Sequence, residues 1–182
     1  MLAIFKKKSV EEKQEKVRPR WQRWGIDFII IVGIFFAVQF WTQRGMVEGD
    51  APDFKEVTLA NNTVSLSDYS GKPLLLYFWA SWCPYCNFEQ SSISDLSKDW
   101  QVLTIAYQSG DAVKVAAFAK ENGIDTWPII VDEDSSLAKK YGVRAVPATY
   151  IIDGNGKIRL KTAGFTTKWG LQLRLWLIKL LS

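Results

Sequence analysis

The sequence contains no histidine, two methionines and two cysteines. With neither a histidine nor a third cysteine, it lacks the residues that most often complete a four-ligand zinc site. The two cysteines, Cys83 and Cys86, are so close in sequence that a disulfide between them would restrict the unfolded chain very little. The sequence also has no internal repeat and no low-complexity tract. These absences favour redox chemistry over a zinc site or a purely structural disulfide.

The cysteines lie where a strand is expected to end and a helix to begin. Residues 74–79 form an unbroken apolar run, which is typical of a strand buried on both faces. Residues 89–98 carry apolar side chains at helical spacing. We therefore expect Cys83 at the start of a helix, with Cys86 one turn further along the same face.

The start of a helix favours a negatively charged group, because its first N–H groups are unpaired and the helix dipole is positive there. A cysteine in this position readily becomes a thiolate, the nucleophilic form of the residue. Pro84 suits the first turn, where a missing N–H removes no helical hydrogen bond. We predict that Cys83 attacks a disulfide and that Cys86 resolves the product.

Positive charge is concentrated near the N-terminus. The net charge is +4, but residues 1–24 hold eight basic and three acidic side chains, whereas the chain from Gly49 onward holds 14 of each. A nucleic-acid-binding domain would carry its surplus on the folded part of the chain. This distribution therefore argues against such a domain.

An apolar segment follows the basic tail. Residues 25–41 would extend about 26 Å as a helix, just enough for a bilayer core of about 30 Å. Trp21, Trp24 and Trp41 flank this segment as aromatic residues flank membrane spans. We predict a transmembrane anchor here, with a buried soluble helix as the alternative.

The basic residues before the segment predict a cytoplasmic N-terminus and an exported remainder. No small-x-small cleavage site follows, which disfavours a removable signal peptide. The predicted organisation is a cytoplasmic tail (1–24), an anchor (25–41), a linker (42–53) and one domain (54–182).

Strands and helices are expected to alternate within the domain. A hairpin should surround the turn at Asn61 and Asn62, and a second should surround residues 153–156. The further expected elements are strands over 102–107, 128–131, 148–152 and 158–160 and helices over 111–122, 135–141 and 168–181. The last helix should pack on the sheet, with contact to a membrane surface as the alternative. This order indicates an α/β fold.

The stretch from Trp79 to Cys86 resembles the active-site signature of the thioredoxin superfamily. With Glu89 three residues later, it is most similar to the membrane-anchored TlpA/ResA branch. Residues 165–177 resemble, more narrowly, the suppressor of copper sensitivity D family. The resemblance implies a thioredoxin fold of the TlpA type, with an inserted βα unit between residues 101 and 131.

In this superfamily a cis-proline loop faces the cysteine pair and binds substrate. The resemblance places Val146 and Pro147 in that loop, where the backbone of Val146 would pair with an extended substrate segment. An ordinary trans proline is the alternative, and it is the favoured interpretation for Pro128, which has similar surroundings. Substrate contacts are also implied for Trp82, Pro84 and Tyr85.

The proton acceptor of thioredoxin is a buried aspartate, and Tyr77 stands at its position here. Glu89 is the replacement that we favour, because it lies one turn from Cys86 and matches the TlpA/ResA pattern. The alternative is a solvated acid on the helix surface. Asn87 and Ser91 replace a basic residue and a proline that are common in the family.

These features predict a thiol-disulfide oxidoreductase in the inner membrane of a bacterium, with its catalytic domain in the periplasm. It would reduce exported proteins, with a membrane protein of the DsbD type as electron donor and no cofactor besides the Cys83–Cys86 disulfide. Two alternatives stay open: an oxidase like DsbA, and a copper(I) chaperone. The lack of histidine, and of methionine after Met46, disfavours the chaperone.

Overall fold

The computed structural model describes residues 20–181, and the chain divides into two compact units between Val38 and Gln39. Most of the predicted basic tail lies outside the described residues. The first unit contains most of helix α1 (Arg20–Thr42). The apolar side chains of α1 are largely exposed, including Phe28 and Trp41. Within residues 20–181, no helix has both the length and the hydropathy required to cross a membrane.

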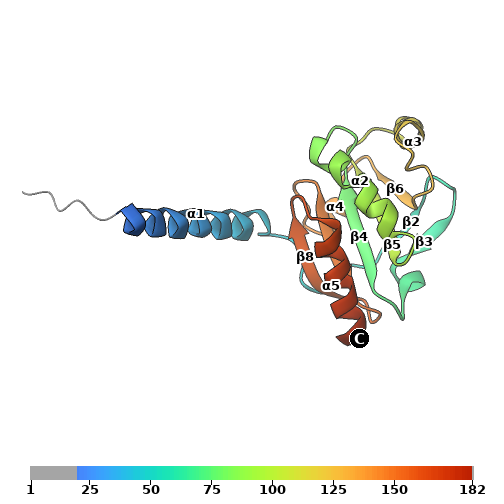
Figure 1. Cartoon of the computed structure of the whole chain (residues 1–182). Helices are drawn as coiled ribbons and strands as arrows, with labels where there is room; N and C mark the ends of the chain where they lie inside the picture. The colour runs from blue at the N-terminus through green and yellow to red at the C-terminus, as the bar shows by residue number, and fades with distance from the viewer. Residues whose placement is uncertain (1–19, 182) are drawn as a thin grey trace, which may run out of the picture. The chain divides into compact units, whose positions relative to one another are not determined.

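The second unit is built on a six-stranded sheet with the order β1-β8-β7-β4-β5-β6 (Figure 1). Strand β4 lies inside the sheet, parallel to β5 and antiparallel to β7. The strands are β1 (Gly49–Asp50), β4 (Leu74–Trp79), β5 (Gln101–Tyr107), β6 (Ile129–Asp132), β7 (Ala148–Ile152) and β8 (Lys157–Ala163). A separate hairpin pairs β2 (Lys55–Val57) with β3 (Thr63–Ser65), as the sequence predicts.

Strand β4 is buried along its whole length, and its side chains alternate between the two faces of the sheet. Leu75, Tyr77 and Trp79 enter one hydrophobic cluster. Their neighbours Leu74, Leu76 and Phe78 enter the other cluster. The apolar run thus follows from burial on both faces, and it places Tyr77 and Trp79 on one face together.

Helices contribute to both clusters, together with residues of the other strands and of loops. Buried residues of α2 (Pro84–Leu96), α3 (Ala112–Glu121) and α5 (Lys168–Leu181) join the cluster that contains Tyr77. Buried residues of α4 (Ser136–Lys140) join the other cluster. A 3-10 turn, η1 (Leu66–Tyr69), precedes β4. The inserted unit implied by the resemblance is present as β5, α3 and β6, whose two strands are parallel.

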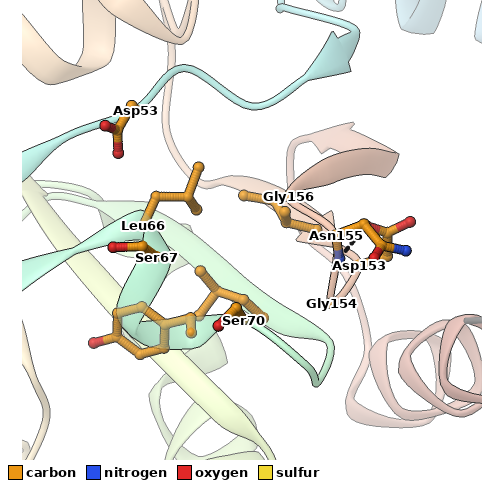
Figure 2. A pocket seen from close by; sticks show the side chains of 11 residues that line it. Asp53, Leu66, Ser67, Ser70, Asp153, Gly154, Asn155 and Gly156 are labelled. Carbon is orange, nitrogen blue, oxygen red and sulfur yellow. Dashed lines mark hydrogen bonds between the residues drawn. The ribbon is translucent and has the colours of Figure 1, made fainter.

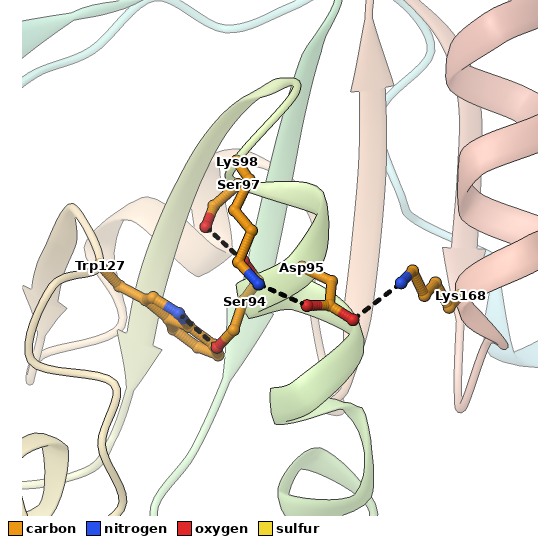
Figure 3. Close-up of polar contacts among 6 residues, drawn as sticks. All are labelled: Ser94, Asp95, Ser97, Lys98, Trp127 and Lys168. Atoms are coloured by element: carbon orange, nitrogen blue, oxygen red, sulfur yellow. Dashed lines mark hydrogen bonds and ion pairs between the residues drawn. The ribbon is translucent and has the colours of Figure 1, made fainter.

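Helix α5 packs on the sheet, as predicted, through Leu171, Leu175 and Ile178. Its opposite face exposes further apolar side chains, including Trp169, Leu173 and Trp176. Figure 3 shows how polar contacts join α2 to its neighbours. Asp95 of α2 pairs with Lys168 of α5 at 2.7 Å. Trp127 donates to Ser94 of α2 at 3.0 Å, which ties the loop before β6 to the same helix.

Part of the predicted linker belongs instead to the domain. Met46 is buried, and β1 pairs with β8 from within the range predicted as linker. The chain also passes very close to Gly142, which follows the C-cap of α4 and has a φ of +69°. A Cβ at Gly142 would lie 1.7 Å from the carbonyl oxygen of Gly45. The sequence did not predict this packing, because the segment contacts the domain through Gly45 and one buried apolar side chain, Met46, in a stretch whose composition is otherwise that of a linker.

The turn between β7 and β8 is organised by Asp153, which is buried. Its Oδ1 accepts the backbone N–H groups of Asn155 and Lys157, each at 2.9 Å. Its Oδ2 accepts Nε of Arg159 at 2.7 Å. This confirms the second predicted hairpin and explains why an aspartate opens it.

Candidate functional site

The two cysteines lie between the end of β4 and the start of α2. Cys83 is the N-cap of α2 with extended backbone (φ −94°, ψ 108°), and Pro84 occupies the first turn. The backbone N–H of Cys86 donates to Sγ of Cys83 at 3.3 Å. Both cysteines are free and buried. The predicted strand-to-helix position is therefore confirmed, and an N–H of the first turn points at the sulfur of Cys83.

The proline loop faces this sulfur. The bond between Val146 and Pro147 is cis, as predicted. The thiol of Cys83 donates to the carbonyl oxygen of Val146 at 3.6 Å. The bond before Pro128 is trans, which confirms the favoured interpretation there. We call Cys83, Cys86, Val146 and Pro147 the cysteine site.

Exposed aromatic side chains surround the cysteine site on α2 and just before it. Trp82, Tyr85 and Phe88 expose 59%, 62% and 71% of their surfaces. Indole Nε1 of Trp82 donates to the carbonyl oxygen of Gln108 at 3.0 Å, which fixes the ring in an exposed position. Pro84 is exposed too. An apolar surface therefore adjoins the buried sulfur of Cys83.

Glu89 lies behind the cysteines rather than on the surface. Its side chain is only 1% exposed. The hydroxyl of Tyr77 donates to Oε2 of Glu89 at 2.9 Å, and the backbone N–H of Thr166 donates to Oε1. The alternative of a solvated acid on the helix surface is therefore wrong, and the role of Glu89 as proton acceptor stays a prediction. Its two oxygens are occupied by Tyr77 and Thr166.

Burial controls the electrostatics of this cluster. It raises the pKa of Glu89, although the hydrogen bonds from Thr166 and Tyr77 oppose the rise. Burial also raises the pKa of Cys86, and the nearby Cys83 thiol adds to that rise. A hydrogen-bonding interaction with the hydroxyl of Tyr77 works in the opposite direction and favours the thiolate of Cys86. Cys86 thus needs a base to lose its proton near neutral pH.

Sequence reasoning did not identify Tyr77 and Thr166 as partners of Glu89. Thr166 lies 77 residues after Glu89, so no local pattern connects the two. Tyr77 carries a weak signal, because it has the only hydroxyl in the apolar run from Leu74 to Trp79. A hydroxyl inside a buried strand requires a hydrogen-bond partner.

A separate pocket of about 310 Å³ lies away from the cysteines (Figure 2). It is lined by Leu74, at the start of β4, and by the turn from Asp153 to Gly156. The cysteines follow the opposite end of β4. Within residues 20–181, no group of three or more acidic or cysteine side chains is placed to hold a metal ion. The cysteine site is therefore the place where redox chemistry is expected.

Comparisons with known proteins agree with this geometry. The model of the AhpC/TSA family matches residues 47–161. The thiol-disulfide oxidoreductase ResA of Geobacillus thermodenitrificans is 32% identical over 154 residues, which cover 81% of this chain and 88% of that protein. The thiol:disulfide interchange protein DsbE of Escherichia coli is 33% identical over 156 residues, covering 76% of this chain and 83% of that protein.

Solved structures show the same fold. The crystal structure of the pneumococcal exposed lipoprotein thioredoxin from Streptococcus pneumoniae matches with a TM-score of 0.64 and 29% sequence identity. The match covers 69% of this chain and 98% of that structure. The fold is therefore thioredoxin-like. Taken together with the family match, these similarities show that the chain belongs to the AhpC/TSA family and is a thiol-disulfide oxidoreductase of the ResA and DsbE type.

Proposed function

We propose that this protein is a membrane-tethered reductase of disulfides in exported proteins and that it works through Cys83 and Cys86. The observation that carries the proposal is the position of the Cys83 sulfur. It caps the start of α2, accepts an N–H of the first turn and lies 3.6 Å from the carbonyl oxygen of Val146. An N–H of the first turn thus points at the sulfur that would attack, and this sulfur lies next to a backbone that can hold a substrate.

In the first step, the thiolate of Cys83 attacks one sulfur of a substrate disulfide. A Cys83–substrate disulfide forms, and the other substrate sulfur leaves as a thiolate. In the second step, Cys86 loses its proton and attacks the sulfur of Cys83. The Cys83–Cys86 disulfide forms and the second substrate sulfur leaves. The pair has then given two electrons to the substrate.

Glu89 is the proposed final acceptor of the Cys86 proton. Burial raises the pKa of Glu89, which brings it nearer to the pH at which a general base works efficiently. Burial also keeps Cys86 protonated until the base acts, because it raises the pKa of this thiol. Cys86 is therefore the proposed proton donor and Glu89 the proposed acceptor.

Substrate binding is proposed along the backbone of Val146, with Pro147 next to it. An extended segment of a partner can pair with such a backbone as a short added strand. Trp82 and Tyr85, which are more than half exposed, would contact apolar side chains on either side of the disulfide. This requirement fits a polypeptide better than a small disulfide.

The membrane tether is proposed for α1 from its sequence, although no helix within residues 20–181 meets the length and hydropathy required to cross a membrane. Exposed apolar side chains along this helix, such as Phe28 and Trp41, need an apolar environment. Basic residues precede the helix in the sequence and favour a cytoplasmic N-terminus. The domain would then lie in the periplasm of a bacterium, where a membrane protein of the DsbD type could supply electrons.

The test is a trapping experiment in cells that produce the full-length chain. Cys86→Ser should accumulate mixed disulfides between Cys83 and exported proteins, because the resolving step is blocked. These adducts should disappear on treatment with reductant. Cys83→Ser is the matched control and should form none. If Cys86→Ser traps no exported protein, or if Cys83→Ser traps as many, the proposed function is wrong.

A further inference from the structure

Helix α5 carries apolar side chains on two opposite faces. Leu171, Leu175 and Ile178 face the sheet and are buried. Four further apolar residues follow one another at intervals of four, three and four positions, which places them together on the face opposite the buried one. All four are more than half exposed: Trp169, Leu173, Trp176 and Leu180. We call them the outer stripe, and an exposed apolar surface of this kind marks a contact site.

A hollow of about 540 Å³ adjoins the outer stripe. Its volume lies within the range of about 300–1,000 Å³ that is usual for ligand sites. Trp176 is four residues after Gln172 and three before Lys179, and both of these line the hollow. Residues at such spacings are neighbours on a helix surface, so the stripe borders the hollow at Trp176. The remaining lining comes from the residues before β4 and around the start of β5: Gly71, Lys72, Pro73, Asp99, Trp100 and Gln101.

Lysines give this hollow, which we call the lysine hollow, a positive charge. Nζ of Lys179 lies 5.7 Å from the centre of the Trp100 ring. Within residues 20–181, neither Lys72 nor Lys179 forms a salt bridge. Asp99 offsets one of them, which leaves the lining with a net charge of +1. The sequence around α5 is also basic, because residues 154–182 contain six basic side chains and no acidic one. The hollow therefore favours an anion.

We propose that the outer stripe and the lysine hollow bind the surface of a bilayer that contains anionic phospholipids. A lipid phosphate would occupy the hollow that Lys72 and Lys179 line. The apolar side chains of the stripe would enter the boundary between headgroups and acyl chains. Helices that carry tryptophan and leucine on one face, with lysine beside them, bind membrane surfaces in this way.

The charges and the aromatic residues favour a bilayer over a second copy of the chain. Two copies that packed stripe to stripe would bring two positively charged hollows together, and like charges across an interface oppose association. Trp169 and Trp176 suit the interface of a membrane, because an indole combines an apolar ring with a polar N–H. A lysine beside them can pack its alkyl chain on apolar surface while its ammonium group reaches a phosphate.

The chain leads from α1 to the domain over a short distance. Met46 is buried in the domain, only four residues after α1 ends at Thr42. Four residues span at most about 14 Å. With α1 in a membrane, as the proposed function has it, the domain would stay within reach of the bilayer surface. The tether would thus supply a high local concentration of lipid, so that a weak contact through α5 is enough.

This contact would leave the cysteine site free. The lysine hollow lies at the start of β4, next to Lys72 and Pro73, whereas the cysteines follow the end of that strand. The six residues of β4 span about 20 Å. Contact with the bilayer would therefore orient the domain while Cys83 stays accessible to exported proteins.

The test places one environment-sensitive fluorophore on the full-length chain in vesicles. Cys83→Ser and Cys86→Ser remove the native thiols, so that one introduced cysteine takes the label. Leu173→Cys puts the probe on the outer stripe, and Val113→Cys, at an exposed position in the first turn of α3, is the matched control. In vesicles of phosphatidylcholine and phosphatidylglycerol, the probe at position 173 should emit as in an apolar environment and the probe at position 113 as in water.

Removal of the lysine charges tests the headgroup site. Lys72→Gln together with Lys179→Gln should lower the ratio of apolar to aqueous emission at position 173 about 30-fold, or about fivefold for each cation at an anionic surface. Lys114→Gln together with Lys120→Gln removes the same charge from α3 and should leave this ratio nearly unchanged. High salt should lower the ratio with all lysines present, because it screens the attraction, and this measurement holds even when a lysine variant does not fold.

A probe at position 173 that emits as in water, or that responds equally to vesicles of phosphatidylcholine alone, would overturn the inference. An apolar signal that disappears in vesicles holding one protein copy each would also overturn it, because a second copy would then cover the stripe. Flotation of the vesicles in alkaline carbonate tests the tether separately. A chain that stays with the vesicles while the probe at position 173 is aqueous refutes only the contact through α5. A chain that carbonate removes, after an apolar signal near neutral pH, refutes only the tether.

Discussion

Glu89→Gln separates the charge of the proposed base from its shape. The side chain is 1% exposed, so a substitution of similar size is needed to keep the packing. A glutamine can still accept the N–H of Thr166 with its carbonyl oxygen. Towards Tyr77, however, it presents an amide nitrogen, which donates and cannot accept a proton. The variant therefore removes the proton acceptor and little else.

The expected kinetic effect follows from the role of a general base. Loss of such a group slows the step that it assists by about 10²-fold or more. A factor of 10² corresponds to about 2.7 kcal/mol in the activation free energy. The assay mixes the reduced protein with one equivalent of Ellman's reagent, an aromatic disulfide. Attack by Cys83 releases a first coloured thiolate, which provides an internal control. Attack by Cys86 releases a second coloured thiolate, and the rate of this second release measures the step that Glu89 would assist. An unchanged second phase would refute the assignment of Glu89 as the base.

The same variant should change how stability depends on pH. Burial raises the pKa of Glu89 in the folded protein, whereas an unfolded glutamate titrates near its usual pKa of about 4.3. This group therefore contributes its full stability below about pH 4.3 and loses it as the pH rises through the folded pKa. Glutamine cannot ionise and suffers no such loss.

Urea unfolding of both proteins between about pH 4 and pH 8 tests the sign. The free energy of unfolding of Glu89→Gln should improve relative to wild type as the pH rises, because the contributions of all other titrating groups cancel in the difference. A difference that stays constant over this range would show that Glu89 is not an acid whose ionisation opposes folding. In that case the ionised carboxylate of Glu89 would not lower the stability of the folded protein, and the reasoning would fail.

Three further outcomes are expected. Leu175→Ala removes a fully buried side chain of α5 and should lower the free energy of unfolding by about 2–5 kcal/mol in urea titrations. Leu173→Ala is the control: this position is 58% exposed, so the free energy of unfolding should change by about 0.5 kcal/mol or less. Iodoacetamide should label Cys83 before Cys86 near neutral pH, since burial raises the pKa of Cys86 and keeps it a thiol; peptide mass spectrometry that finds Cys86 labelled first would reverse the two roles. Burial opposes ionisation of Asp153, yet hydrogen bonds from the β7–β8 turn and an arginine hold its pKa below the usual range. Asp153→Asn should therefore lower the thermal midpoint near neutral pH. The difference in thermal midpoint between variant and wild type should shrink in acid, as wild-type Asp153 becomes protonated.

The parts of the site that are local in sequence could be predicted from it. The apolar run of β4 and the proline after Cys83 give the strand, the helix start and the place of the sulfur. The role of Pro147 required the resemblance to a family, because nothing near it in the sequence points to Cys83. In the structure the Cys83 thiol contacts the carbonyl oxygen of Val146, the residue before Pro147, although 63 residues separate Cys83 from Val146 in the sequence.

The parts that depend on distant contacts could not be predicted. Glu89 could be placed one turn after Cys86, but its burial depends on Thr166, which approaches from the loop before α5. The edge strand β1 has only two residues, Gly49 and Asp50, and no apolar alternation marks it. Its pairing with β8 is determined by the backbone and by the burial of Met46, which a composition of linker type does not reveal.

The division of labour between β4 and α2 has a physical reason. A second carboxylate at the position of Tyr77 would lie beside Glu89, and two buried carboxylates raise each other's pKa because they repel when both are ionised. A tyrosine avoids this repulsion, since its hydroxyl stays neutral and stabilises the ionised Glu89 through a hydrogen bond of 2.9 Å. With the acid on α2, a hydroxyl on β4 is therefore the arrangement that keeps a single buried charge and gives it a hydrogen bond.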